Sequence, residues 1–430
     1  MIDIKHDIRL VPYSPIRLSD PFEVRFQAKG TGKEIHLSIY LDEDGKSASL
    51  LKECSTYVPE GRYAFLRFYC LKASEILEEG RHILYFHADG DTAELAFEAV
   101  SERKVVLDGG FIMFGPPNDR TACDLWREQL KKMTNEDWRR YICDMHGIGQ
   151  SCIIVNAAVQ LLSISNKEYG AHYPSKLVKK SDITADDPLE AVLQTADQLG
   201  MNVFIGIGNN YGGNAELKDW ELDERILEEV YTGYGHHTSL YGWYIARECN
   251  LCHPFENYMK GAPLLYKRAQ ELSPVLPFLI SPYIVNEGDS NMEEGLNRFW
   301  ELGFDIFMPQ DMMGQRFNQE LMTVAQSRVF HEKARHACDT AGRHFWGNNE
   351  AFNFTEDGKY LVPRYLGGGV FGEEGFIEQI RAVDPFVEKR MNFMDSAFFT
   401  PAHTQNLPGG EAAVKQYEDY KKYYEAEVSK

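Results

Sequence analysis

The residues Leu240 to Glu248 (LYGWYIARE) form a short, mostly apolar run that ends on a carboxylate. A run of this length is typical of a strand that is buried on both faces. It is one of eight such runs after residue 103. The others are KVVLDGGFIMFG (104–115), SCIIVNAAV (151–159), NVFIGIGN (202–209), PFLISPYI (277–284), DIFMPQD (305–311), HFWGNNEAF (344–352) and NFMDSAFF (392–399).

Segments with helical patterns separate these runs. DDPLEAVLQTADQLGM (186–201) begins with acidic residues and a proline in the first turn, and a glycine follows its last turn. The other helix candidates are 138–149, 224–234, 258–272, 291–303, 320–342, 375–390 and 411–428. Eight strands that are each followed by a helix predict a (β/α)8 TIM barrel over residues 103–430. A doubly wound sheet is the competing α/β fold, but the glycine-rich GGGVFG (367–372) follows no strand and matches no phosphate-binding fingerprint.

The first 102 residues follow a different pattern, in which apolar and polar side chains alternate. Period two is typical of half-buried antiparallel strands, and turn clusters such as DEDG (42–45) separate the segments. We therefore expect an accessory domain over 1–102 that is an all-β, immunoglobulin-like sandwich. Its expected strands are FEVRFQA (22–28), EIHLSIYL (34–41), YAFLRFYCL (63–71), RHILYFHA (81–88) and AELAFEAV (93–100).

Charge and composition narrow the classes of partner. The chain has 430 residues and a formal net charge of −20, so nucleic acid is a poor candidate. No window is apolar enough to span a membrane, and the N-terminus MIDIKHDIRL does not have the pattern of a signal peptide. The eight cysteines are scattered, as expected of reduced thiols, and together these features indicate a cytoplasmic protein. A mature secreted chain that has lost its signal peptide would look the same.

Metal ions and cofactors are not expected from the sequence. Cys249 and Cys252 have CxxC spacing, but a structural zinc site needs a second such pair. His236 and His237 follow a predicted helix and are interpreted as capping it, with a metal site as the less favoured alternative. A metal-dependent hydrolase of the amidohydrolase type needs an HxH pair on the first barrel strand, and VVLDGGFIMFG contains no histidine. No phosphate cradle or Schiff-base lysine is recognisable.

The active site of a TIM barrel lies at the C-terminal ends of its strands, so the residues there are the candidates. Glu248 and Glu350 end the fourth and seventh strands, and we expect them to be catalytic. Amides, acids and aromatic rings are the groups that bind sugar hydroxyls and sugar faces. The residues of this kind expected to bind the substrate are Asn156, Asn209, Tyr211, Trp243, Tyr283, Gln310, Asp311, Trp346 and Asn349.

Two carboxyl groups that face each other across a barrel mouth fit glycoside hydrolysis. One donates a proton to the leaving oxygen, and the other attacks the sugar or activates water. A separation of about 5 Å would predict retention of configuration through a covalent intermediate. The acid needs a raised pKa, which burial beside Trp243 or a second carboxylate could supply.

Other interpretations of the same residues remain open. A single glutamate after a strand is commonly a solvated loop acid, and Asp311 could be a turn residue. Trp346 and Tyr283 could belong to the core or form a platform for a sugar ring. A non-catalytic, carbohydrate-binding barrel would keep the aromatic rim without needing both acids. That protein is the alternative to a glycoside hydrolase.

The chain also resembles known families. Its strand-four and strand-seven glutamates are similar to those of the clan A glycoside hydrolases, which implies Glu248 as acid/base and Glu350 as nucleophile. It resembles more closely a bacterial family of glycosidase-like barrels that is described only as a domain of unknown function. The matching segments are GGFIMFG (109–115), DDPLEAVLQTADQLGMNVFIGIG (186–208), YGWYIARE (241–248) and DIFMPQDMMG (305–314). The sequence departs from the clan pattern at Arg247, where those enzymes have an asparagine before the acid/base.

Overall fold

The computed structural model describes residues 2–208, 215–251, 256–283, 292–314, 322–364, 372 and 375–429. It divides into two compact units. The first comprises Met1–Arg103, Lys267–Pro277 and Asp339–His344, and the second comprises Lys104–Tyr266, Phe278–Cys338 and Phe345–Lys430. Among the described helices, none combines the length and the apolar character needed to cross a bilayer.

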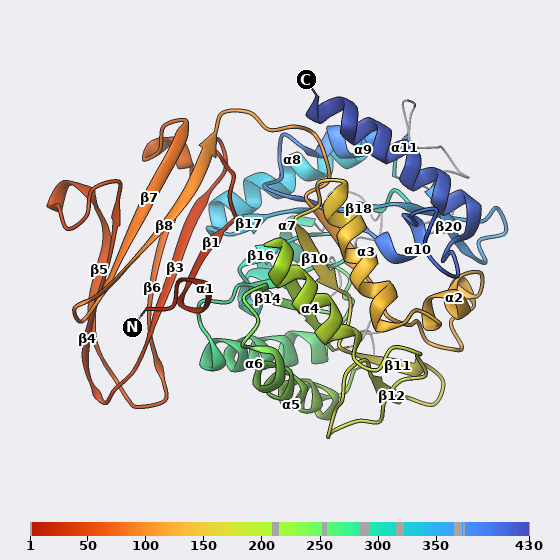
Figure 1. Ribbon diagram of the computed structural model, residues 1–430, viewed down its shortest axis with the longest axis horizontal. Coiled ribbons are helices and arrows are strands. Elements are labelled where there is room, and N and C mark those ends of the chain that lie inside the picture. Colours follow the sequence, from red (N-terminus) through yellow and green to blue (C-terminus); the bar gives the residue numbers. More distant parts are fainter. Residues whose placement is uncertain are drawn as a thin grey trace. The chain divides into compact units, whose positions relative to one another are not determined.

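The first unit contains two β-sheets, drawn as red to orange arrows in Figure 1. One has the strand order β1 (Ile8–Val11), β3 (Phe22–Lys29), β6 (Tyr63–Cys70). The other has the order β2 (Ile16–Arg17), β8 (Asp91–Val100), β7 (Gly80–Ala88), β4 (Lys33–Leu41), β5 (Leu50–Val58). The short helices are α1 (Ile4–Asp7), η1 (Ser47–Ser49) and η2 (Ala73–Glu75).

Aromatic side chains join the two sheets into a sandwich. Phe22 stacks on Phe97 at 5.3 Å between ring centroids, and Phe26 meets Phe86 edge to face at 5.2 Å. In each pair one ring comes from the three-stranded sheet and the other from the five-stranded sheet. Alternation within the strands therefore buries one face of each sheet in a shared core, which gives the N-terminal region its β-rich architecture.

Strand β5 is absent from the sequence-based prediction. It pairs with β4 at the edge of the five-stranded sheet, and most of its side chains are exposed or half-buried. An edge strand with little buried surface carries no alternating apolar pattern, so periodicity could not reveal it.

The second unit contains a nine-strand barrel sheet with helices around it (Figure 1). The strand order is β17 (His344–Phe345), β16 (Ile306–Phe307), β15 (Phe278–Ile280), β14 (Leu240–Ile245), β13 (Asn202–Ile207), β10 (Cys152–Val155), β9 (Gly109–Ile112), β21 (Arg390–Phe393), β18 (Gly347–Glu350). Every pairing whose register is given in this sheet is parallel.

Strands β17 and β18 are two halves of the predicted seventh strand. Only Trp346 separates them, and its N–H donates to the carbonyl of Phe307 in β16 at 2.9 Å. The next N–H, of Gly347, donates to the carbonyl of Lys389 before β21 at 2.8 Å. The seventh strand thus pairs with β16 through its first half and with β21 through its second. This exchange closes the sheet into the predicted (β/α)8 barrel.

The barrel helices follow the strands in the predicted order. They are α3 (Asn135–Gly147), α4 (Pro188–Leu199), α5 (Leu217–Tyr234), α6 (Glu256–Leu272), α7 (Met292–Phe299), α8 (Val324–Ala341), α9 (Phe376–Val383) and α11 (Gly410–Val428). Shorter elements between them are η3 (Thr121–Cys123), α2 (Arg127–Lys131), β11 (Val159–Ser163), β12 (Glu168–Ala171), η4 (Trp300–Leu302), β19 (Phe352–Phe354), β20 (Leu361–Pro363) and α10 (Asp395–Phe398).

Helix α4 shows how local sequence sets element boundaries. The side chain of Asp187 caps its start by accepting from the N–H of Glu190, and Pro188 occupies the first turn. Gly200 ends the helix in the left-handed conformation, with φ of 68°. These are the start and stop signals read from the sequence.

The eighth strand lies earlier than the sequence suggested. The prediction placed it at 392–399, whereas β21 is Arg390–Phe393 and the following residues form helix α10. All four residues of α10 are buried. Periodicity cannot distinguish a short buried helix from a buried strand, and the apolar run MDSAFF therefore suggested a strand.

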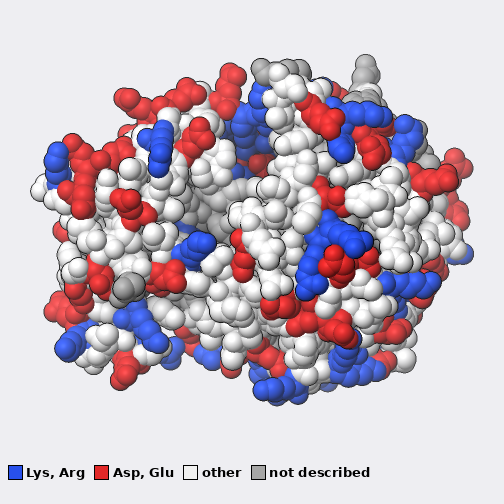
Figure 2. Space-filling view, viewed as in Figure 1, with Lys and Arg blue, Asp and Glu red and all other residues white. Residues whose placement is uncertain are grey.

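Charged side chains cover both units in a mixed pattern. Figure 2 shows acidic side chains over much of the face drawn, with basic side chains between them. On the face drawn, the acidic side chains are therefore interspersed with basic ones rather than gathered in one patch. Such a distribution favours solubility.

Candidate active site

Ring contacts across the barrel show which side chains face its interior. Phe111 of β9 lies 5.4 Å from the ring of Tyr244 in β14, although these strands are not neighbours in the sheet. Phe111 also contacts Phe393 of β21 at 5.3 Å. Deeper in the barrel, Phe204 of β13 meets Trp346 at 5.6 Å. Since successive strand side chains point to opposite faces, these contacts fix the orientation of the residues that follow in each strand.

Glu350 faces the interior at the C-terminal end of β18. Trp346, Asn348 and Glu350 alternate with outward-facing residues, and Glu350 is in register with the interior residue Phe393. The Glu350 side chain is almost fully buried, and its Oε2 accepts from the backbone N–H of Gly314 at 2.7 Å. A backbone donor of this kind favours the charged form of a carboxyl group.

Glu248 lies just beyond β14, two positions after Ala246 and four after the inward-facing Tyr244. Its side chain is partly exposed and is hydrogen-bonded to the side chain of Gln310. Burial raises the pKa of Glu248, while the positive charge of Arg120 and the Gln310 bond oppose the shift. A glutamic acid with a raised pKa is suited to donate a proton near neutral pH.

Gln310 connects the surroundings of the two glutamates. It forms an isolated parallel bridge with Asn348, two residues before Glu350 in β18. Its side chain bonds Glu248 on the other side. Both glutamates are therefore close to Gln310 at the same end of the barrel, as a joint role would require.

Polar and aromatic groups surround this pair. Asn348 Nδ2 donates to Ser281 Oγ at 3.0 Å, and its Oδ1 has no hydrogen-bond partner among the described residues. Asn156, which follows the interior residue Ile154 at period two, likewise has a buried Nδ2 without such a partner. The half-buried Tyr283 lies close enough to Glu248 for that charge to contribute to its raised pKa, after burial. These groups offer a donor, an acceptor and a ring to a ligand.

Arg247 points away from Glu248. Its Nε donates to Asp223 of α5 at 2.5 Å, and its guanidinium lies 5.2 Å from the ring centre of Trp220. Both members of the ion pair are buried between the barrel wall and α5. The departure from the clan pattern is therefore a packing feature outside the barrel, and Arg247 is absent from the groups that shift the pKa of Glu248.

Asp311 and Asn349 lie on the outer side of the barrel wall. Asn349 Nδ2 donates to Asp311 Oδ2 at 3.0 Å, and Gln379 of α9 donates to the same oxygen at 2.5 Å. The other oxygen of Asp311 accepts from the N–H groups of Met313 and Glu350. Asp311 is fully buried, and its four bonds tie the loop after β16 to β18 and α9. We therefore leave both residues out of the site, as corrections to the sequence-based set.

The two tryptophans also lie away from the mouth. Trp243 alternates with the interior Tyr244 and packs its ring against Tyr231 of α5 at 6.3 Å. Trp346 is in the deeper layer beside Phe204, and its Nε1 donates to Glu388 at 3.2 Å. Both are fully buried and are packing residues, so they too are removed from the expected substrate contacts.

Of the other residues expected to bind the substrate, two are not among the described residues and three lie at the barrel mouth. Asn209 and Tyr211 lie outside the described residues. Asn156, Tyr283 and Gln310 lie at the mouth with the glutamates. Sequence reasoning placed Asn348 at the end of the seventh strand without choosing it as a substrate-binding residue, and it did not consider Arg120. Alternation back from Glu350 could have indicated Asn348, whereas Arg120 is brought in by the long loop after β9 and has no sequence signal.

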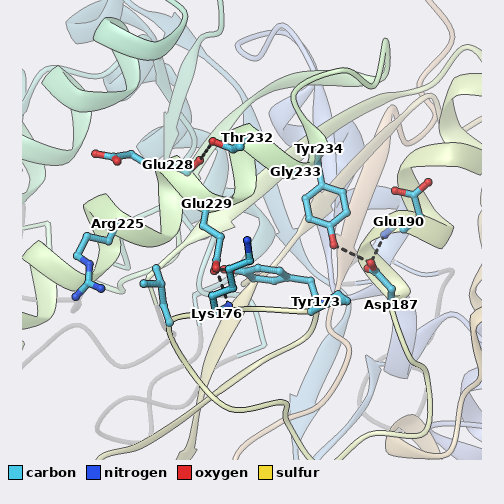
Figure 3. A pocket seen from close by; sticks show the side chains of 12 residues that line it. Tyr173, Lys176, Asp187, Glu190, Arg225, Glu228, Glu229, Thr232, Gly233 and Tyr234 are labelled. Carbon is cyan, nitrogen blue, oxygen red and sulfur yellow. Dashed lines mark hydrogen bonds between the residues drawn. The ribbon is translucent and has the colours of Figure 1, made fainter.

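A separate pocket of about 620 Å³ lies on the outer helical layer, between α4, α5 and the segment after β12 (Figure 3). The Tyr173 and Tyr234 rings meet at 5.9 Å in its wall, and their hydroxyls donate to Glu229 and Asp187 at 2.7 Å each. The pocket contains none of the sequence-predicted site residues. Next to it, Glu190, His236 and His237 bring three potential metal-ligand atoms together.

The fold defines the class of the protein as a (β/α)8 barrel with a β-rich N-terminal region. The chain belongs to the family described as a domain of unknown function (DUF4434), whose model matches residues 107–404. No curated protein matches the sequence.

Several solved structures are similar to this chain. A β-glucuronidase of Parabacteroides merdae has 13% identity and a TM-score of 0.41 over 97% of this chain and 52% of its own. A β-glucuronidase of Bacteroides uniformis has 13% identity and a TM-score of 0.44 over 98% and 49%. The GH99 endo-α-mannosidase of Bacteroides thetaiotaomicron has 10% identity and a TM-score of 0.43 over 75% and 99%. The chain spans about half the length of the two β-glucuronidases.

Proposed function

We propose that the protein is a glycoside hydrolase in which Glu248 is the general acid/base and Glu350 the nucleophile. The observation that carries this proposal is the position of the two glutamates. They follow the inward-facing positions of the fourth and seventh barrel strands and are linked through Gln310 and Asn348. Two carboxyl groups at one barrel mouth are the minimum that glycosidic hydrolysis needs.

The different surroundings of the two carboxyl groups support this proposed division of roles. Burial raises the pKa of Glu248, so this group carries a proton to higher pH than an ordinary glutamate. The Gly314 N–H bond stabilises negative charge on Glu350. Glu248 would protonate the leaving oxygen while the Glu350 carboxylate attacks the anomeric carbon. Glu248 would then remove a proton from the water that hydrolyses the glycosyl-enzyme.

The substrate would be held by the groups whose polar atoms have no hydrogen-bond partner among the described residues. Asn156 Nδ2 can donate to a sugar hydroxyl, and Asn348 Oδ1 can accept from one. Tyr283 offers a half-buried ring beside the acid, against which the C–H face of a sugar can pack. An oligosaccharide or glycoside is therefore the proposed substrate class.

A panel of aryl glycosides and oligosaccharides tests the proposal, with the double variant Glu248→Gln/Glu350→Gln as the blank. We expect each single variant to lose at least about 10³-fold in kcat on a cleaved substrate while keeping the circular dichroism spectrum of the unaltered protein. Glu229→Gln, on the outer pocket, is the matched control and should keep full activity. Full turnover in either active-site variant would refute the role of that residue.

The anomer of the first product distinguishes the mechanisms. Proton NMR of the fresh product should show retained configuration if Glu350 forms a covalent intermediate, and inverted configuration if it activates water instead. Saturable glycan binding without hydrolysis across the panel would favour a carbohydrate-binding barrel. In that case Asn156 and Tyr283 variants would weaken binding, while both glutamine variants would retain it.

A further inference from the structure

Glu190, His236 and His237 form a cluster on the outer layer of the barrel, away from both glutamates of the mouth. One potential ligand atom from each residue lies within 4.8 Å of the other two. Glu190 Oε2 and His237 Nε2 are 3.1 Å apart, and the two imidazole rings have centroids 4.3 Å apart. Two imidazoles and a carboxylate are a common ligand set for zinc in proteins.

Asp197 determines which nitrogen of His237 faces the cluster. Its Oδ2 lies 2.7 Å from His237 Nδ1, while its Oδ1 accepts from the N–H of Ser239 at 2.6 Å and from the hydroxyl of Thr238 at 3.0 Å. A carboxylate in this position accepts the Nδ1 proton of His237. Such a carboxylate–histidine contact is the usual support of a metal-bound imidazole, because it fixes the tautomer and orients the ring.

The Nε2 atom of His237 faces the carboxylate of Glu190. At 3.1 Å these two atoms are close enough to share a proton or a cation. The separation is close to the ligand–ligand edge of about 3.3 Å that tetrahedral zinc with bonds near 2.0 Å requires. A metal ion therefore satisfies both groups at once.

The three candidate ligands lie in a capped helix and in a hydrogen-bonded turn. Glu190 is in the first turn of α4, behind the Asp187 cap and Pro188 (Figure 3). The histidines lie in the turn between α5 and β14, where the N–H of His237 donates to Tyr234 and its carbonyl accepts from Leu240. His237 is buried, whereas Glu190 is partly exposed and His236 exposed, so an ion can enter from solvent and keep a water as fourth ligand.

We propose that Glu190, His236 and His237 bind a divalent transition-metal ion of the zinc class, with Asp197 orienting His237. The ion links the start of α4 to the turn before β14, which is the strand that leads to Glu248. Because it binds the folded chain only, it stabilises the folded state. The site is independent of the proposed catalytic pair.

Isothermal titration of the tag-free, chelator-treated protein with ZnCl2 tests the site, and native mass spectrometry gives the stoichiometry. We expect one equivalent to bind, with a dissociation constant that rises at least about 10-fold in both Glu190→Gln and His236→Ala. His146→Ala, at an exposed histidine of α3, is the matched control and should bind as the unaltered protein does. Zinc should raise Tm in the unaltered protein and the control more than in the two variants.

A second measurement distinguishes this site from the Cys249–Cys252 pair. Co²⁺ bound to nitrogen and oxygen ligands lacks the thiolate charge-transfer band, and Cys252→Ser should leave zinc affinity unchanged. The proposal is overturned if Glu190→Gln and His236→Ala bind zinc as the unaltered protein does. It is also overturned if no saturable binding occurs below about 1 mM zinc, or if NMR of zinc-treated protein shows protons on both ring nitrogens of His237.

Discussion

The side chain of Gln310, beyond β16, hydrogen-bonds the carboxyl group of Glu248, beyond β14. Strand β15 lies between these two strands in the sheet. The bond favours the charged form of Glu248 and so opposes the burial that raises its pKa. After burial and the positive charge of Arg120, a residue from another strand thus also influences the protonation of the proposed acid, and mutation can remove this influence.

Gln310→Met is expected to move the pH profile of the enzyme. Methionine keeps the length of the side chain and removes the bond, so the pKa of Glu248 should rise further. Since the proposed acid must be protonated, activity falls as pH rises through this pKa. The basic limb of kcat/KM against pH should therefore shift to higher pH. Gln326→Met, at an exposed position, is the control, and an unmoved limb in Gln310→Met would contradict the assignment of Glu248 as the acid.

Tyr283→Ala and Trp243→Phe are expected to separate binding from packing. The Tyr283 ring is half-buried beside Glu248, and its loss should raise KM about 2- to 10-fold. Trp243 is fully buried against Tyr231, so Trp243→Phe should lower the free energy of unfolding by about 1–3 kcal/mol and leave KM unchanged. Urea denaturation measures the change in stability, and steady-state kinetics measure KM. A raised KM in Trp243→Phe would show that Trp243 contributes to substrate binding.

Arg247→Met is expected to destabilise the barrel without moving the basic limb of the curve of kcat/KM against pH. It leaves the buried Asp223 without its partner, which should reduce the free energy of unfolding by about 3–5 kcal/mol. The double variant Arg247→Met/Asp223→Leu removes both charges and should recover much of that loss. Chemical denaturation measures the three variants. A shifted basic limb in Arg247→Met would show instead that the guanidinium acts on Glu248.

Asp395→Asn is expected to stabilise the protein at high pH. Burial raises the pKa of Asp395 to about 7, although Gln150 and Asn392 donate bonds that oppose the shift. The folded chain thus holds a proton that the unfolded chain releases near pH 4. The stability due to this proton is complete below the unfolded pKa and is lost as pH rises toward 7.

The asparagine variant should therefore be more stable than the unaltered protein by roughly 2–4 kcal/mol at pH 8, with little difference at pH 4. Urea unfolding at both pH values measures this difference. A stability gap that does not change between pH 4 and pH 8 would show that Asp395 does not titrate in this range.

Much of the fold was predictable because local chemistry determines it. Asp187, Pro188 and Gly200 set the ends of α4 through capping and backbone preference, which act within a few residues of sequence. Apolar runs separated by helical patterns predicted the barrel. The sequence patterns did not predict the exposed edge strand β5 or the buried helix α10. Strand β5 has no alternating apolar pattern, and α10 has a buried apolar run of the kind expected of a strand.

The sequence by itself predicted a barrel in which Glu248 and Glu350 come at the ends of strands four and seven; β18 does end at Glu350, whereas β14 ends at Ile245, three residues before Glu248. Only the tertiary structure decided that Gln310 bonds Glu248, that Arg247 and Asp311 face the helices, and that Trp243 and Trp346 are core residues. The physical reason is the period of two in a strand, because a shift of one residue in register moves a side chain from the barrel interior to the helical layer. Register is set by pairing between distant segments, which the order of residues does not reveal.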